Sequence, residues 1–154
     1  MTTIDRSRWE HLYRGAFPDV YRAVLSTVLD PELALDAVHD AFEVGLRTPP
    51  ADDANLTGWL FRVAVRRAMR ARLRRPRAAL APTYVSELDR ALDRIETGQL
   101  LALLTTRQRA IVVAHYFLGL RQEEIADLLG IRRGTVGATI SHALARMREE
   151  HTNG

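Results

Sequence analysis

Apolar residues recur every three or four positions along most of the chain, which is the spacing of one face of an α-helix. The first such stripe begins near Trp9, and Gly15 and Pro18 are expected to mark a break or a fresh first turn within it. A second stripe follows Asp30 and Pro31, where the aspartate can cap a helix that the proline begins. The pattern therefore predicts an all-α fold.

The second expected helix has two different faces. Its buried face is expected to comprise Leu33, Ala37, Val38, Ala41 and Phe42. Its outer face carries Asp36, Asp40 and Glu43, with no arginine between them. A face of this kind is most often simply solvated, so by itself it identifies no partner. A loop is expected over residues 48–55, because two prolines and small or polar residues there cannot continue the helix.

The third expected helix, 56–75, combines an apolar face with a strongly basic one. Its inward residues are expected to be Trp59, Leu60, Val63 and Ala64. Its polar face carries Arg62, Arg66, Arg67, Arg70 and Arg74. Trp59 and Phe61 lie beside the arginines, so aromatic surface is available for base stacking. We therefore interpret this helix as binding a nucleic acid.

Charge and composition narrow the function further. Residues 1–61 hold ten acidic residues against five arginines, residues 62–77 hold eight arginines and no acid, and residues 78–154 hold nine of each. The arginine block of residues 62–77 indicates a surface that binds a polyanion, whereas the acidic residues 1–61 are expected to contact a different partner. Without cysteine and with five scattered histidines, no cofactor, metal or catalytic site is expected. No stretch is apolar enough to span a bilayer, so we expect no membrane insertion and a cytoplasmic protein.

A stretch with two prolines and mostly small residues, 76–86, is expected to link two small helical domains. The domains would comprise residues 1–75 and 87–154. In the second domain, Thr105 or Thr106 can cap a helix. The inward residues of that helix are expected to be Ile111, Val112, His115 and Tyr116.

Two short helical patterns meet across a tight turn within residues 120–149. Gly130 can take the left-handed conformation that ends the first helix, and Thr135 can cap the second. The four residues from this glycine to Arg133 join them, as a helix-turn-helix requires. Arg132 and Arg133 lead into the second helix, where DNA would lie. The motif predicts DNA binding by the carboxyl-terminal domain.

Two groups of motifs follow one another in a specific order. The first consists of ALDAVHDAF followed by WLFRVAVRRAMRARLRR, and the second is TTRQRAIVVAHYFLGLRQEEIADLLGIRRGTVGATISHALARMRE. The first group resembles the core-binding and promoter-melting part of extracytoplasmic-function sigma factors of RNA polymerase. The second resembles their C-terminal promoter-binding domain. The resemblance extends from about Trp9 to Arg148.

The resemblance implies an alternative sigma factor, which binds the β′ and β subunits of core RNA polymerase and promoter DNA, with an anti-sigma factor as a further partner. Its polymerase-binding residues would be Asp36, His39, Asp40, Phe42 and Glu43. Its minus-ten DNA-binding residues would be Asn55, Trp59, Arg62, Arg66, Arg67, Arg70 and Arg74. Its minus-thirty-five DNA-binding residues would be Arg132, Arg133, Thr135, Thr139 and His142. Since RNA synthesis is carried out by the polymerase, the chain itself would not be an enzyme.

The recognition helix departs from the family pattern. Gly137 and Thr139 stand where the family's helix is usually basic, and His142 replaces an arginine. Few bidentate guanine contacts are then available, so we expect shallow reading of sequence. Two other functions stay open. One is a stand-alone helix-turn-helix repressor or activator, and the other is a degenerate sigma-like protein that binds polymerase or a regulator without initiating transcription.

Overall fold

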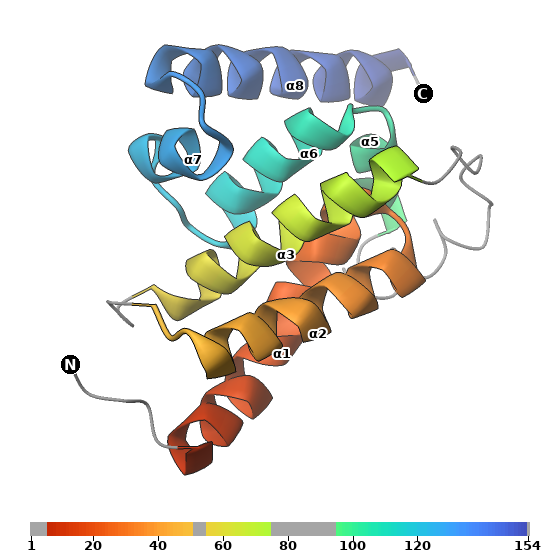
Figure 1. The fold of residues 1–154 in the computed structure, drawn as a ribbon. Coiled ribbons are helices and arrows are strands. Elements are labelled where there is room, and N and C mark those ends of the chain that lie inside the picture. The colour runs from red at the N-terminus through yellow and green to blue at the C-terminus, as the bar shows by residue number, and fades with distance from the viewer. Residues whose placement is uncertain (1–5, 51–54, 75–94, 154) are drawn as a thin grey trace.

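A computed structural model of the 154-residue chain describes residues 6–50, 55–74 and 95–153. These residues form α-helices and one π-helical turn, and no strand occurs among them, so the all-α prediction is confirmed (Figure 1). The predicted linker 76–86 and the first residues of the helix after it lie outside the described residues.

Three helices pack against one another and form the amino-terminal half: α1 (Arg6–Val28), α2 (Pro31–Arg47) and α3 (Leu56–Arg74). Their shared core contains fully buried aliphatic and aromatic side chains, among them Val20, Val24, Val38, Leu60, Phe61 and Val65. These residues recur at helical spacing, which is why one face of each helix turns inward.

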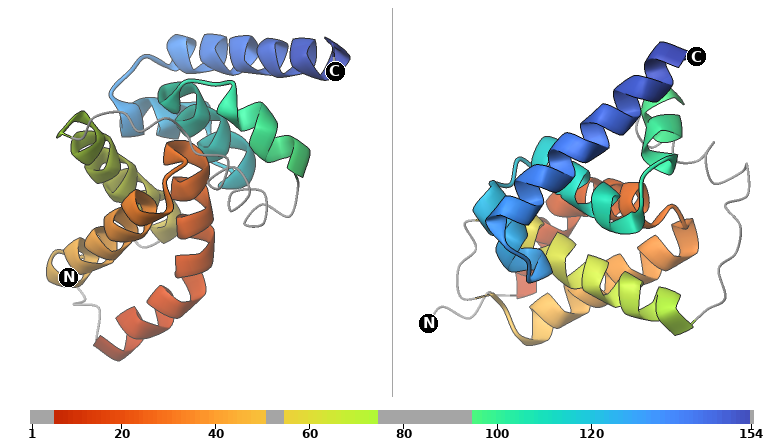
Figure 2. Two further views of the ribbon diagram at one scale, coloured as in Figure 1. Left: turned by 90° about the vertical axis from the view of Figure 1, so that its right-hand side faces the viewer. Right: turned by 90° about the horizontal axis from the view of Figure 1, so that it is seen from above.

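Helix α1 continues through Pro18, so the expected break there is wrong. Proline lacks the N–H of a helical residue and its ring meets the carbonyl of residue i−4, which bends a helix without necessarily ending it. Figure 2 shows that α1 is curved along its length. The helix ends at Val28, and Leu29 follows with a left-handed φ of 55°.

Helix α2 begins as its sequence predicts. The Asp30 side chain accepts a hydrogen bond from the Leu33 backbone N–H at 3.2 Å, and every residue expected on the apolar face is buried. Near the end of the helix, the indole rings of Trp9 and Trp59 cover Gly45. A Cβ at this glycine would collide with the Trp9 ring and lie 3.2 Å from Cζ3 of Trp59. The absence of a side chain therefore lets both rings approach α2.

The described residues of the carboxyl-terminal half form five elements: α5 (Ile95–Ala102), α6 (Thr106–Val112), η1 (Val113–Phe117), α7 (Gln122–Leu129) and α8 (Arg133–Asn153). Helix α8 packs across α5, α6 and α7 on the side of the molecule away from α2 (Figures 1 and 2). Thr105, one of the two threonines expected to cap α6, does so, and the cap is reciprocal with Gln108. The two halves are in contact, because α1 packs against both α6 and η1.

The π-helical turn changes which side chains face inward after α6. Ile111 and Val112 are buried as predicted, and His115 is half-buried with Nδ1 3.0 Å from the Leu120 carbonyl oxygen. Tyr116, however, is 59% exposed, so its expected burial is wrong. A π turn holds more residues than an α turn, and it rotates the residues that follow away from the α-helical phase.

Candidate functional site

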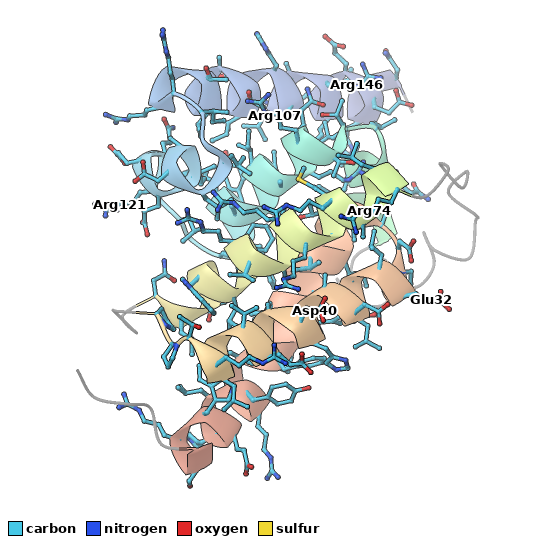
Figure 3. All side chains as sticks on the ribbon, viewed as in Figure 1. Glu32, Asp40, Arg74, Arg107, Arg121 and Arg146 are labelled. Carbon is cyan, nitrogen blue, oxygen red and sulfur yellow. The ribbon has the colours of Figure 1, made fainter. Side chains whose placement is uncertain are left out.

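The acidic face of α2 is open to solvent. Asp36, His39 and Glu43 are exposed and Asp40 is half-buried. Figure 3 shows Asp40 and Glu32 along this helix, whereas Arg146 lies on α8 across the molecule. The Asp40 carboxylate lies 3.5 Å from Arg67 and the Glu43 carboxylate 3.8 Å from Arg47, in pairs whose side chains are largely exposed. Exposed pairs of this kind bind weakly, so the face stays available to a partner.

Phe42 is buried beside this face, and its expected contact with polymerase stays a prediction. The side chain is buried, and its ring meets that of Tyr13 edge-on with centroids 4.4 Å apart. Phe42 therefore holds α2 against α1. Next to it, an open hollow of about 440 Å³ lies between the two helices, lined by aromatic rings from both and by Leu46. The sequence did not reveal the hollow, because it depends on how the two helices pack.

The basic face of α3 is as the sequence predicts for its arginines. Arg66, Arg67, Arg70 and Arg74 are exposed and Arg62 is half-buried. Partial burial, and then the charges of Arg62 and Arg70, lower the pKa of Arg66 below its ordinary value. The base-stacking role expected for Phe61 is wrong, because the ring is fully buried. Trp59 is half-buried and retains some exposed surface.

Asn55 connects α3 to the carboxyl-terminal half. Its Oδ1 accepts a hydrogen bond from the Gly58 N–H at 3.1 Å, which caps α3, and its Nδ2 donates to Glu124 Oε2 at 3.1 Å. The Glu124 carboxylate also accepts from the backbone N–H and the Nε of Arg121. These hydrogen bonds, led by the backbone N–H of Arg121, lower the pKa of Glu124.

Three arginines make further hydrogen bonds across the junction between the halves. Arg66 donates to the Leu128 carbonyl, in the last turn of α7, at 3.1 Å. Arg72 donates to Thr106 Oγ1 at 3.2 Å and to the Val28 carbonyl at the end of α1. These bonds could not be predicted from the sequence, because most of the acceptors are backbone carbonyls.

Arg109 is the third of them, and it is the most buried. Only 5% of it is exposed, and it donates to the Thr27 carbonyl at 2.7 Å, to the Leu104 carbonyl and to Thr106 Oγ1 at 3.1 Å. Burial, and then the charge of Arg72, lower the pKa of Arg109 to about 10. It therefore remains charged at neutral pH, with oxygen acceptors in place of a carboxylate.

The helix-turn-helix is formed by α7 and α8. Gly130 has φ of 65°, so its predicted left-handed conformation is confirmed. Helix α8 begins at Arg133, which leaves three residues in the turn instead of the expected four and places Thr135 in the first turn instead of at the cap. Gly137 faces α7, where a Cβ would lie 3.2 Å from Gln122 Oε1. This glycine therefore permits a close approach of the two helices.

The side chains on the outer face of α8 are mostly short. Arg132, Arg133, Thr135 and His142 are exposed, but Thr139 is half-buried and its hydroxyl donates to the Thr135 carbonyl at 2.7 Å. Arg133 Nε lies 3.2 Å from Glu123 Oε1, so its charge already has a partner.

Two exposed residues of this face were missed, Ala138 and Ser141. Val136, Ile140 and Ala143 are buried, and at 100° per residue the opposite side of the helix centres on positions 138 and 141. The helical phase of the apolar residues could have identified them.

Residues 94–147 match the family model described as Sigma-70, region 4, which covers α5 to most of α8. Over 153 aligned residues, the chain is 32% identical to the ECF RNA polymerase sigma factor SigM of Mycobacterium tuberculosis, an alignment that covers 93% of this chain and 76% of that protein. The chain belongs to the extracytoplasmic-function family of RNA polymerase sigma factors.

Other members of this sigma factor family match over shorter regions. The RNA polymerase sigma-E factor of Streptomyces avermitilis is 37% identical over 75 residues, which are 49% of this chain but only 40% of that factor. The co-crystal structure of the sigma factor RpoE with the anti-sigma factor NepR from Bartonella quintana has a similar fold. Its TM-score is 0.69 at 20% identity, with 91% of this chain and 94% of that chain covered.

The described residues were expected to include no membrane-spanning helix and no metal site. None of the helices they form is long and apolar enough to cross a membrane. No group of three or more histidine or acidic side chains among them is placed to hold a metal ion.

Proposed function

We propose that the chain is an alternative sigma factor, which binds core RNA polymerase and directs it to promoters. The observation that carries this proposal is the alignment with SigM over 93% of the chain, which includes the acidic helix, the basic helix and the helix-turn-helix together. A stand-alone regulator would need only the last of these. Sigma factors are typically regulators without catalytic activity, and in this proposal all chemistry belongs to the polymerase.

The acidic face of α2 is the proposed contact with polymerase. Asp36 and Glu43 are exposed on it, and Asp40 adds a third carboxylate. A surface with three carboxylates along one helix favours a basic partner surface and speeds association with it. His39 lies on the same face, with its ring stacked on that of Phe17.

The basic face of α3 is the proposed contact with minus-ten DNA. Its exposed guanidinium groups can bind phosphates, and one phosphate contact per arginine would make binding strongly dependent on salt. Trp59 is the aromatic residue of this region that retains some exposed surface for stacking on an unpaired base. Asn55 and Arg66 belong to the same region, although both have partners within the chain in the present structure.

The exposed start of α8 is the proposed contact with minus-thirty-five DNA. Arg132 and Arg133 lie at its amino-terminal end, where backbone N–H groups also favour an anion. Thr135, Thr139 and His142 follow along the helix as the proposed readers of base edges. Because they are short or offer a single hydrogen bond, we expect weak discrimination between bases.

In this proposal the halves, residues 1–75 and 87–154, act as separate DNA-binding domains joined by the linker. The partners are the β′ and β subunits of core polymerase, promoter DNA and an anti-sigma factor. An anti-sigma partner is supported by the similar fold of RpoE, which was crystallised with NepR. The protein would act in the cytoplasm, where its polymerase is found.

Run-off transcription with purified core polymerase and genomic DNA fragments tests the proposal. The chain should produce discrete transcripts that core polymerase alone does not produce. Reversing Asp36 to arginine should abolish them and weaken retention of the chain by core polymerase. Glu150→Arg, at an exposed acid near the end of α8, is the matched control and should change neither the transcripts nor the retention appreciably. Failure of the wild-type chain to bind core polymerase would refute the proposal.

One observation favours a second candidate, a sigma-like protein that binds polymerase without initiating transcription. At the start of the recognition helix, one of the two arginines is already paired with an acid, since Arg133 Nε lies 3.2 Å from Glu123 Oε1. In that case the chain would bind core polymerase and yet yield no transcript from any fragment.

A further inference from the structure

The recognition helix α8 has no side chain at Gly137, on the flank where it meets α7. Val136 is buried and Ala138 is exposed, and around the helix Gly137 lies between them. The glycine is half-buried. It therefore borders the outer face of α8, which the proposed function assigns to DNA.

The side chain of Gln122 fills the space beside this glycine. Gln122 is the first residue of α7, and α7 packs against α8 near the start of that helix (Figure 1). A Cβ built at Gly137 would lie 3.2 Å from Gln122 Oε1, 3.9 Å from Cδ and 4.0 Å from Nε2. The whole carboxamide therefore lies against the α8 backbone, at the place where a side chain of the recognition helix would begin.

This carboxamide is available to a ligand. Gln122 is half-buried, so part of the side chain still reaches solvent. Within the described part of the chain its amide forms no hydrogen bond, whereas the amides of Asn55 and Gln108 both have partners. A carboxamide offers two N–H donors and a carbonyl acceptor, and leaving such groups partly buried without a partner costs free energy. A ligand that satisfies them is therefore favoured.

The ligand that matches a carboxamide on the flank of a recognition helix is an adenine. In the major groove adenine presents N7 as an acceptor and the N6 amino group as a donor, which the two ends of a glutamine amide can bind together. The first turns of a recognition helix lie against base edges, and Gly137 belongs to these turns. Ala138 and Ser141 beside it are short and exposed, so they leave room for the amide to reach a base.

We propose that Gln122 reads one adenine of the promoter across Gly137, in place of the side chain that the recognition helix lacks there. This inference rests on the proposed function, because that function places α8 in the major groove. It adds a residue of α7 to the readers Thr135, Thr139 and His142, and it supplies the bidentate contact that these three cannot make. Gly137 provides the space for this contact, and Gln122 provides the hydrogen-bonding groups.

Selection of bound sequences from a randomised duplex library by the full chain tests the proposal. The wild type should select a motif with an adenine at one position. Gln122→Ala should lose the preference at that base pair and keep the rest of the motif, and the loss should be about 5- to 150-fold in discrimination. Gln122→Glu keeps the shape but replaces the amide donor with an acceptor. Its preference at the same base pair should change from adenine to cytosine, whose amino group a carboxylate accepts.

Two further variants separate reading of a base from a structural role. In Gly137→Ala the new Cβ forces the Gln122 amide to move, so the adenine preference should weaken at the same base pair, although alanine favours the helix. Gln99→Ala, at an exposed glutamine on α5, is the matched control and should leave the motif unchanged. A residue that only stabilises the fold or binds a phosphate would affect all sequences alike. A uniform loss of affinity with an unchanged motif in both Gln122 variants would therefore overturn the proposal, as would an unchanged motif and affinity in both.

The outcome can be separated from that of the proposed function, because the selection contains no polymerase. If the wild-type chain supports transcription but Gln122→Ala keeps the adenine preference, the role of Gln122 is wrong and the function stands. If Gln122→Ala loses that preference but the wild-type chain does not bind core polymerase, the role of Gln122 stands and the sigma factor function fails.

Discussion

Replacing Glu123 with glutamine should strengthen binding of the carboxyl-terminal half to duplex DNA. In the structure, Glu123 on α7 pairs with Arg133 at the start of α8, with Nε and Oε1 3.2 Å apart. Glu123 therefore forms an ion pair with the arginine that is best placed to reach a phosphate. It also adds a negative charge to a surface that has to approach a polyanion.

The size of the gain follows from the exposure of this pair. The Arg133 and Glu123 side chains are 68% and 52% exposed, and pairs of this kind contribute about 0.2–1 kcal/mol. Removing a unit charge about 8 Å from a phosphate in water contributes about 0.5 kcal/mol more. The sum corresponds to a gain in affinity of roughly three- to tenfold. One added phosphate contact should also steepen the salt dependence by about 0.9 in log K against log salt.

Fluorescence anisotropy of a labelled duplex, titrated with the full chain at several salt concentrations, measures both quantities. Glu150→Gln, the same change at an exposed site far along α8, is the control and should have a smaller effect. Adding Arg133→Ala to Glu123→Gln should remove the part of the gain that depends on the freed arginine and leave the about 0.5 kcal/mol that comes from loss of the negative charge. The same full gain with and without Arg133, or no gain at all in Glu123→Gln, would refute the reasoning.

Three further outcomes follow from local geometry. Gly45→Ala should lower the free energy of unfolding by about 1–2 kcal/mol in urea titrations, because the clash with Trp9 outweighs the better helix propensity of alanine, and an unchanged midpoint would contradict it. Thr105→Ala should cost about 1 kcal/mol, since it removes half of the reciprocal cap with Gln108; serine at the same position should restore most of the loss. The pKa of Glu124 is lower in the folded chain than its ordinary value of 4.5. The ionised Glu124 therefore stabilises the fold fully above about pH 4.5, and this stabilisation is lost as the pH falls through the lowered pKa. Melting temperatures between pH 3 and pH 7 should therefore fall less steeply in Glu124→Gln than in the wild type.

Local rules predicted most of the helices and several of their ends. Asp30, Thr105 and Gly130 act as expected because caps and left-handed turns depend only on neighbouring residues. The errors arose where packing overrides such rules. Pro18 bends a helix that packs along its length, and Tyr116 is turned outward by a π-helical turn that no residue pattern announced.

The candidate surfaces were predictable to the extent that each lies on one helix. The acidic face of α2 and the arginine face of α3 follow from helical spacing alone. The base-stacking role of Phe61 was wrongly predicted because an aromatic residue near a polar face can point either way, and only the packing of α1 against α2 and α3 decides it. The junction was not predictable at all, since Arg109 and its acceptor at Thr27 are 82 residues apart in the chain.

Most acceptors of Arg72 and Arg109 are main-chain carbonyls, which every amino acid provides. Substitutions at Thr27, Val28 or Leu104 therefore leave the acceptor in place, and natural variation at these sites need not track the arginines. Pairwise covariation between homologous sequences would not reveal the contact, however strongly selection maintained it. By contrast, a single arginine side chain, that of Arg109, donates three of the hydrogen bonds. Loss of the contacts between the two halves would then arise by one-step mutation at the arginines far more readily than at Thr27, Val28 or Leu104.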